Sequence, residues 1–157
     1  MKDTVNKLSQ WKSDVLRIGE SVSDETWNMP IEAGKWSIRE VAGHMLYWDL
    51  YLNREGLPAI LNSQGIVFPN HDEYNAQSVH YIDGKSKSEI VNEAAEQRDR
   101  LLTSLESLSE DRWMIPISIN GVLTDNSGNP YTLNGLMLEF VGHDRHHVSQ
   151  IKAMVTV

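Results

Sequence analysis

Hydrophobic residues recur every three or four positions in four segments of the chain, a spacing typical of one face of an α-helix. The first segment follows Asp3, which can cap a helix. Its apolar positions are Val5, Leu8, Trp11, Val15, Ile18 and Val22. Pro30 and Gly34 break the pattern within residues 23–35. The sequence therefore predicts a first amphipathic helix of about 20 residues.

Capping boxes, in which a serine is followed three positions later by a glutamate, indicate the start of two further helices. Ser37 and Glu40 open the second helix, whose apolar positions are Val41, Met45, Trp48 and Leu52. This helix is expected to end near residues 56–58, which include Pro58. Ser86 and Glu89 open the third helix, whose apolar positions are Ile90, Ala94, Leu101, Leu105 and Leu108.

The remaining segments are less regular. Residues 57–85 form a long connection that is predicted to contain short helical pieces at 58–63 and 72–80. Residues 115–123 alternate around Asn120 and Gly121, which indicates a small β-hairpin, although Pro116 would confine its strand to an edge. Thr132 can cap a last helix that runs to about Met154.

Four long helices with little strand favour an all-α four-helix bundle, formed by one domain over residues 1–157. The connections between the first two and the last two helices are long, so crossover connections and an up-up-down-down order are expected. Residues 22–31 resemble residues 108–117, and each segment leads into a capped helix that contains Gly-His. We interpret this as two related helix pairs whose histidines face each other.

The composition narrows the function. The chain has 14 basic and 22 acidic residues, a net charge of −8, and no cysteine. The missing cysteines exclude disulfides, thiolate zinc sites and a cysteine nucleophile. The acidic balance argues against nucleic acid as a partner. The N-terminus lacks the apolar segment of a signal peptide, and no apolar run would span a membrane, so we expect a cytoplasmic protein without a membrane partner.

Three of the six histidines form the candidate site. His143 and His147 are four residues apart, so they lie on one face of a helix. Two imidazoles placed in this way can share one metal ion. They belong to a stripe of residues spaced alternately three and four positions apart, which we expect to face the bundle core. Its members are Phe140, His143, His147, Gln150 and Met154. His44 occupies a matching stripe of the second helix. Three inward histidines suit zinc, nickel, iron or copper, whereas each alone would more often be a hydrogen-bonded core residue.

Several neighbours are assigned to the same site. Trp48 and Gln150 are predicted to line a substrate pocket, and Tyr51 is predicted to donate a proton or a hydrogen bond. Glu40 is either a partner of His44 or only a helix cap, and His146 is a competing ligand nearer the rim. The remaining polar residues are expected on solvated surfaces, namely His71, His80, Arg98, Asp99 and Arg100.

The residues 36–44 (W-S-I-R-E-V-A-G-H) and 143–151 (H-D-R-H-H-V-S-Q-I) resemble those of the DinB-like family of four-helix metalloproteins. The resemblance covers essentially the whole chain. It implies an up-up-down-down bundle, a divalent metal held by His44, His143 and His147, and frequent homodimers. Several relatives transfer low-molecular-weight thiols such as bacillithiol, mycothiol or glutathione to electrophiles, a chemistry of detoxification and stress. The family name refers to induction by DNA damage, not to DNA binding.

Three hypotheses follow. The first is a thiol transferase that acts on small molecules, with zinc or nickel as the metal and a low-molecular-weight thiol as co-substrate, because the chain has no cysteine of its own. The second is a metal-dependent hydrolase, for which the best available bases are Glu40 and Asp144. The third is a non-catalytic metal-binding stress protein, which a fourth ligand such as His146 would favour.

Overall fold

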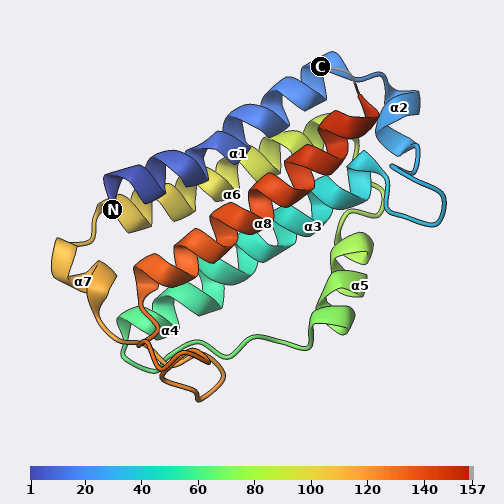
Figure 1. Cartoon of the computed structure of the whole chain (residues 1–157). Coiled ribbons are helices and arrows are strands. Elements are labelled where there is room, and N and C mark those ends of the chain that lie inside the picture. Colours follow the sequence, from blue (N-terminus) through green and yellow to red (C-terminus); the bar gives the residue numbers. More distant parts are fainter. Residues whose placement is uncertain (156–157) are drawn as a thin grey trace.

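The computed structural model describes residues 1–155, which form a bundle of four long helices with shorter helices between them (Figure 1). The long helices are α1 (Lys2–Ser21), α3 (Ile38–Tyr51), α6 (Lys87–Glu106) and α8 (Leu133–Met154). The shorter elements are α2 (Asp24–Asn28), the π-helix η1 (Leu52–Gly56), α4 (Leu57–Leu61), α5 (His71–Tyr81) and α7 (Glu110–Met114). The predicted all-α four-helix bundle is therefore confirmed.

The long helices form a square in which α1 and α3 each pack on α6 and on α8. Thr4 donates a hydrogen bond to Asn134, so α1 and α8 start at the same end of the bundle. Lys87 at the start of α6 donates to the carbonyl of Val22 after α1, so these two helices are antiparallel. Arg39 at the start of α3 donates to the carbonyl of Lys85 just before α6, and Asn53 in η1 after α3 donates to Gln97 further along α6, so α3 and α6 are parallel. The order of directions is thus up-down-down-up and differs from the expected up-up-down-down.

The reason lies in which connection crosses the bundle. Residues 22–37 and 107–132 are long because they contain α2 and α7, which close the two ends of the bundle (Figure 1). The connection that returns along the bundle is the one from α4 through α5 to α6 (Figure 1). The resemblance between the two end segments has a structural counterpart, because α2 and α7 each bury one tryptophan, Trp27 and Trp113.

The second helix continues further than expected. It passes from α3 through η1 into α4 and ends at Leu61 instead of near residues 56–58. Pro58 lies in the first turn of α4, directly after the π-helical turn η1, and the chain stays helical past it. The two predicted short helices are present as α4 and α5.

The predicted hairpin at 115–123 is reduced to its turn. Asn120 and Gly121 both have positive φ, of 51° and 81°, and the backbones of Ile119 and Val122 exchange two hydrogen bonds of 2.9 Å. Beyond this turn, residues 1–155 contain only isolated β-bridges, one of which joins Ile119 to Ile66. Apart from the Ile119–Val122 pair, the segment pairs with residues outside it, at Ile66 in the connection after α4 and at Thr132 before α8.

The apolar core consists of two clusters, one at each end of the bundle. Along α6 and α8, the polar residues Arg98 and Asp144 lie between them. The expectation that Arg98 is solvated is wrong, because its side chain is 1% exposed and is paired with Asp49 and Asp144. Asp99 and Arg100 do lie on the surface, where they pair with Lys12 and Glu96. No helix in the described part of the chain has the length and apolarity that a bilayer crossing requires.

Candidate metal centre

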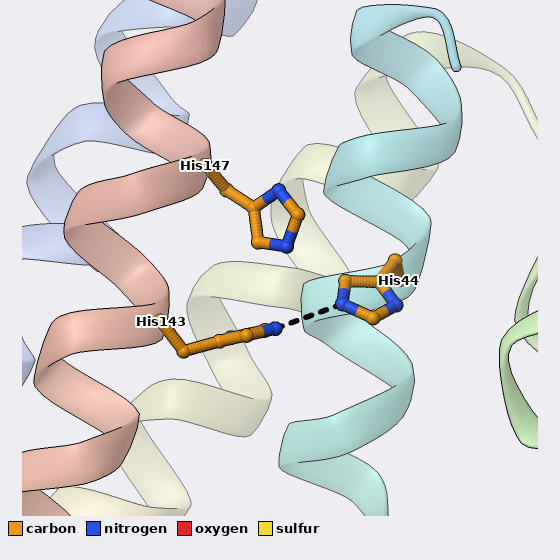
Figure 2. A group of neighbouring side chains, drawn as sticks. All are labelled: His44, His143 and His147. Carbon is orange, nitrogen blue, oxygen red and sulfur yellow. Dashed lines mark hydrogen bonds between the residues drawn. The ribbon is translucent and has the colours of Figure 1, made fainter. Parts of the chain in front are cut away.

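His44 on α3 and His143 and His147 on α8 point into the space between the two helices (Figure 2). One ring nitrogen of each lies within 4.8 Å of the others. The Nε2 atoms of His44 and His143 are 2.9 Å apart, so one of these rings donates to the other in the structure. Among the described residues, no further histidine, cysteine or carboxylate joins the group.

The position of the triad follows from helix geometry. The Ser37–Glu40 capping box is formed, which fixes the start of α3 and the rotational position of His44. On α8 the stripe that faces the core is one position away from the expected one and consists of Met137, Val141, Asp144, Val148 and Ile151. The predicted stripe is only half-buried at its histidines. The triad therefore borders the core and is open to the groove between α3 and α8.

The rings of the triad are neutral near physiological pH. Desolvation, followed by the charges of His143 and His147, lowers the pKa of His44 to about 3. Desolvation, followed by the charge of His147, lowers the pKa of His143 to about 4, and burial also lowers the pKa of His147. A neutral imidazole keeps a lone pair on one nitrogen, which is the form that binds a metal.

A hydrogen bond settles which nitrogen of His147 is available. The Nδ1–H of His147 donates to the Oε1 of Gln150 at 2.9 Å, which leaves the Nε2 lone pair directed at the other rings. The Nδ1 of His44 is buried and has no hydrogen-bond partner within residues 1–155. This nitrogen lies on the side of the ring away from the other two histidines (Figure 2), and the Nε2 that faces His143 is the atom that a cation between the rings would meet.

The donor set fits a divalent cation. Tetrahedral zinc with nitrogen ligands at 2.0–2.1 Å places those nitrogens about 3.4 Å apart. The Nε2 atoms of His44 and His143 are 2.9 Å apart and one nitrogen of each ring lies within 4.8 Å of the others, so small rotations of the rings reach this geometry. Three imidazoles leave at least one coordination position open, which is the arrangement of catalytic rather than structural zinc sites.

Two pockets adjoin the triad and share the walls formed by Trp36 and His147. The first, called here the apolar pocket, has a volume of about 390 Å³ and is lined mainly by Trp36, Trp48, Phe68, Leu136, Phe140 and the triad. The second, called here the polar pocket, has a volume of about 690 Å³ and is lined by residues that include Glu32, Lys35, His146, His147, Ser149 and Gln150.

The predicted neighbours of the triad are placed as follows. Trp48 lines the apolar pocket and donates through Nε1 to Asn75. His146 is exposed and lines the polar pocket, outside the group of three nitrogens. The carboxylate of Glu40 accepts from the backbone and hydroxyl of Ser37, so Glu40 is engaged as a cap. The hydroxyl of Tyr51 donates to the carbonyl of Val67 at 2.6 Å, and a catalytic role for Tyr51 stays a prediction.

Two residues of the apolar pocket were missed by the sequence reasoning. Glu139 precedes His143 by four residues, so the spacing that identified the two histidines also indicates this carboxylate. His71 is exposed, as expected, but it starts α5 instead of lying in a loop and is close to Trp48, with ring centroids 5.5 Å apart. No periodic pattern marks His71, because its place depends on where α5 folds back onto α3.

The amino-acid sequence matches the family model of the DinB superfamily over residues 8–151. The chain belongs to the DinB superfamily. None of the curated proteins compared matches the chain significantly.

Two solved structures of this fold are similar to the chain. YfiT from Bacillus subtilis, described as a probable metal-dependent hydrolase with an unusual four-helix bundle topology, has a TM-score of 0.73 and 14% identity. The match covers 98% of this DinB superfamily chain and 84% of YfiT. ClbS, a colibactin self-resistance protein solved in complex with dsDNA, has a TM-score of 0.72 and 14% identity, with 98% and 93% of the two chains covered.

The complex of ClbS corrects one expectation. Nucleic acid was excluded as a partner because of the net charge of −8, yet a protein with this fold lies in complex with dsDNA. The exclusion is therefore wrong for the fold. Net charge sums over the whole surface, whereas a partner meets only a local region of it.

Proposed function

We propose that this DinB superfamily protein is a metal-dependent enzyme in which His44, His143 and His147 hold a divalent cation, with zinc or nickel as first candidates. We further propose that it transfers a low-molecular-weight thiol to a small electrophile. One observation supports the transfer in particular: the triad lies where two separate pockets meet, which suits a reaction between two molecules.

The reaction is R–SH + R′–X → R–S–R′ + H–X. A sulfur–carbon bond forms, the carbon–X bond breaks with its electron pair leaving on X, and the thiol proton is passed on to X or to solvent. A divalent cation on the triad would lower the pKa of the thiol, so that thiolate is available at neutral pH. The chain contributes the imidazoles that hold the cation, and Glu139 and His71 stand in the pocket wall as proton acceptors.

Hydrolysis is the second candidate, and one observation favours it. The sequence offered no carboxylate that faced the site, but Glu139 lines the apolar pocket together with the triad. A carboxylate in this position suits a general base that acts on water. YfiT, which shares the fold, is described as a probable hydrolase. The two candidates differ in whether product formation requires an added thiol.

The test begins with the metal content of protein purified without a histidine tag, followed by turnover of a model electrophile with and without thiol. Turnover that depends on thiol and is lost in His147→Ala supports the transferase. Turnover without thiol, lost in His147→Ala and in Glu139→Gln, supports the hydrolase instead. His80→Ala is the matched control, because His80 is exposed and, among residues 1–155, pairs with Asp83 alone. Stoichiometric metal without turnover of either kind would favour a non-catalytic stress protein.

A homodimer and a role in stress or detoxification belong to the same proposal. Both derive from the resemblance to DinB-like proteins. Light scattering of the purified chain measures the first directly, and a monomer at micromolar concentration would remove it. The second depends on finding the electrophile that the enzyme consumes.

A further inference from the structure

The two pockets lie at opposite ends of one groove between α3 and α8. Along α8 the polar pocket takes its lining from His146 to Met154, and the apolar pocket from Leu136 to His147. Because α3 and α8 are antiparallel, Trp36 before α3 faces the C-terminal half of α8, and Trp48 faces its N-terminal half. The triad stands between the two ends, with the Trp36 ring centroid 5.0 Å from that of His44.

The two ends differ in chemistry, although each also contains residues of the other kind, such as Ile31 and Met154 in the polar pocket and Glu139 in the apolar pocket. In the apolar pocket, the rings of Trp36, Trp48, Phe68 and Phe140 supply flat apolar walls. Such walls select flat apolar molecules, which stack on aromatic rings at little cost in desolvation.

The polar pocket presents two opposite charges on a tight turn. The backbone N–H of Lys35 donates to the carbonyl of Glu32, and Gly34 between them has a φ of 75°. Both side chains are exposed, and neither forms an ion pair with another described residue. Ser149 and Gln150 add hydrogen-bonding groups on the facing helix. A small zwitterion that carries a carboxylate and an ammonium group matches this wall.

We infer that the groove holds two reactants in separate sites: a flat, apolar electrophile in the apolar pocket and a small zwitterionic co-substrate in the polar pocket, which meet at His147 and Trp36. This inference rests on the proposed transfer reaction and assigns each reactant a place and a chemical class. A hydrolase needs only one of these sites, since its second reactant is water.

The test measures the two sites separately in metal-loaded protein with inert probes. Nitrobenzene, which is flat and quenches indole fluorescence, reports on the apolar pocket through Trp36 and Trp48. S-methylglutathione, a zwitterion that has no free thiol, reports on the polar pocket by calorimetry. We expect each probe to bind saturably in the presence of the other. Loss of either saturation, or competition between the probes, overturns the inference.

Two variants add a crossed readout. Phe140→Ala is expected to raise the dissociation constant of nitrobenzene by about 10-fold, because one aromatic wall of its pocket is lost. The dissociation constant of S-methylglutathione should stay unchanged. Lys35→Met is expected to raise the dissociation constant of S-methylglutathione by about 2- to 5-fold, because a solvent-exposed charge contact contributes little. The dissociation constant of nitrobenzene should stay unchanged. Lys2→Met, which removes a lysine at the opposite end of the bundle, controls for net charge. If both variants weaken the same probe, or neither weakens its own, the assignment is refuted.

The outcomes also separate this inference from the proposed function. Independent binding of both probes without any thiol-dependent turnover keeps the two sites and removes the transferase. Thiol-dependent turnover that is lost in His147→Ala, together with competition between the probes, keeps the transferase and removes the two sites.

Discussion

Two groups of polar side chains interrupt the apolar interior of the same bundle, and they are built on opposite principles. One is centred on Arg98 and joins α1, α3, α6 and α8. The other is the histidine triad between α3 and α8. Both draw on α8, where Asp144 directly follows His143 in the chain, yet the two side chains leave the helix on different faces.

The Arg98 group is complete in itself. Its five N–H donors reach Asp49, Asp144 and the carbonyl of Leu8 at distances of 2.5–3.1 Å. Two carboxylates face one guanidinium, so the group carries a net negative charge. Burial, which outweighs the attraction of Arg98, raises the pKa of Asp49 to about 6. Nothing in this group is left for a ligand to satisfy.

The triad is incomplete in the same terms. Its rings are neutral, the Nε2 atoms of His44 and His143 have only each other at 2.9 Å, and two pockets reach the group. A polar group that only holds a fold together satisfies its own atoms, whereas a group that binds a ligand leaves some of them available. The Arg98 group therefore contributes to stability, and the histidine triad is available for binding. The following predictions test this division of roles.

The largest effect is expected from Arg98→Met, which leaves two buried carboxylates without their partner. The free energy of unfolding should fall by about 3–5 kcal/mol in urea titrations, because an uncompensated buried charge is strongly destabilising. Arg100→Met removes an exposed arginine two residues after Arg98. It should lower the free energy of unfolding by less than about 0.5 kcal/mol. If Arg98→Met fails to fold at pH 8, Arg98→Lys provides the milder variant. A cost for Arg98 variants no greater than for Arg100→Met would refute the division.

The next effect concerns metal and should be confined to the triad. A divalent cation at 100 times its dissociation constant should raise the free energy of unfolding by about 2.7 kcal/mol, because only the folded chain assembles the three nitrogens. His147→Ala should abolish this gain while changing the metal-free stability by less than about 1 kcal/mol. Thermal unfolding of wild type and variant, each with and without zinc or nickel, measures both quantities. An equal gain in the two proteins would show that the cation binds elsewhere.

These two groups also show how far the sequence could be read. Helical spacing and capping residues suffice for the four long helices and for placing His143 and His147 on one side of α8, because these depend on local geometry. The core face of α8 was misplaced because two adjacent stripes share the same three-four spacing. The true one, from Met137 to Ile151, contains Asp144 and so looks less apolar.

Other features depend on distant partners. Arg98 looks like any surface arginine until Asp49 from α3 and Asp144 from α8 are placed beside it. His71 and the direction of α3 depend on which connection returns along the bundle. Neither local propensity nor periodicity carries that information.

The third prediction concerns pH in metal-free protein. The pKa values of His44 and His143 are about 3 and 4 in the folded chain and 6.5 unfolded, so the unfolded chain binds more protons below pH 6.5. Their contribution to stability is therefore complete above pH 6.5 and is lost as the pH falls. Asp49 acts in the opposite direction, because its pKa of about 6 exceeds its unfolded value of 3.8.

The histidines shift further than the aspartate, so the net free energy of unfolding should fall by about 2 kcal/mol between pH 8 and pH 5. Urea titrations at the two pH values measure this difference. His143→Asn removes one of the three histidines whose pKa is lowered and should reduce the fall to about half or less. A stability that is constant or rises as the pH falls would show that the rings are protonated in the folded chain.

The smallest effect should come from Gln150, which touches the triad through one hydrogen bond. Gln150→Leu removes the acceptor of the His147 Nδ1–H, so the ring is free to rotate and its Nε2 is no longer held towards His44. Loss of such a supporting hydrogen bond typically weakens metal binding by about 10-fold. Gln77→Leu, at an exposed position of α5, is the matched control. Competition with a chromophoric chelator measures the affinity, and Gln150→Glu should retain it because a carboxylate accepts the same bond. If Gln150→Leu binds metal as tightly as Gln77→Leu, packing alone orients His147. The triad would then hold its geometry without a supporting hydrogen bond, and it would resemble the Arg98 group in needing nothing outside itself.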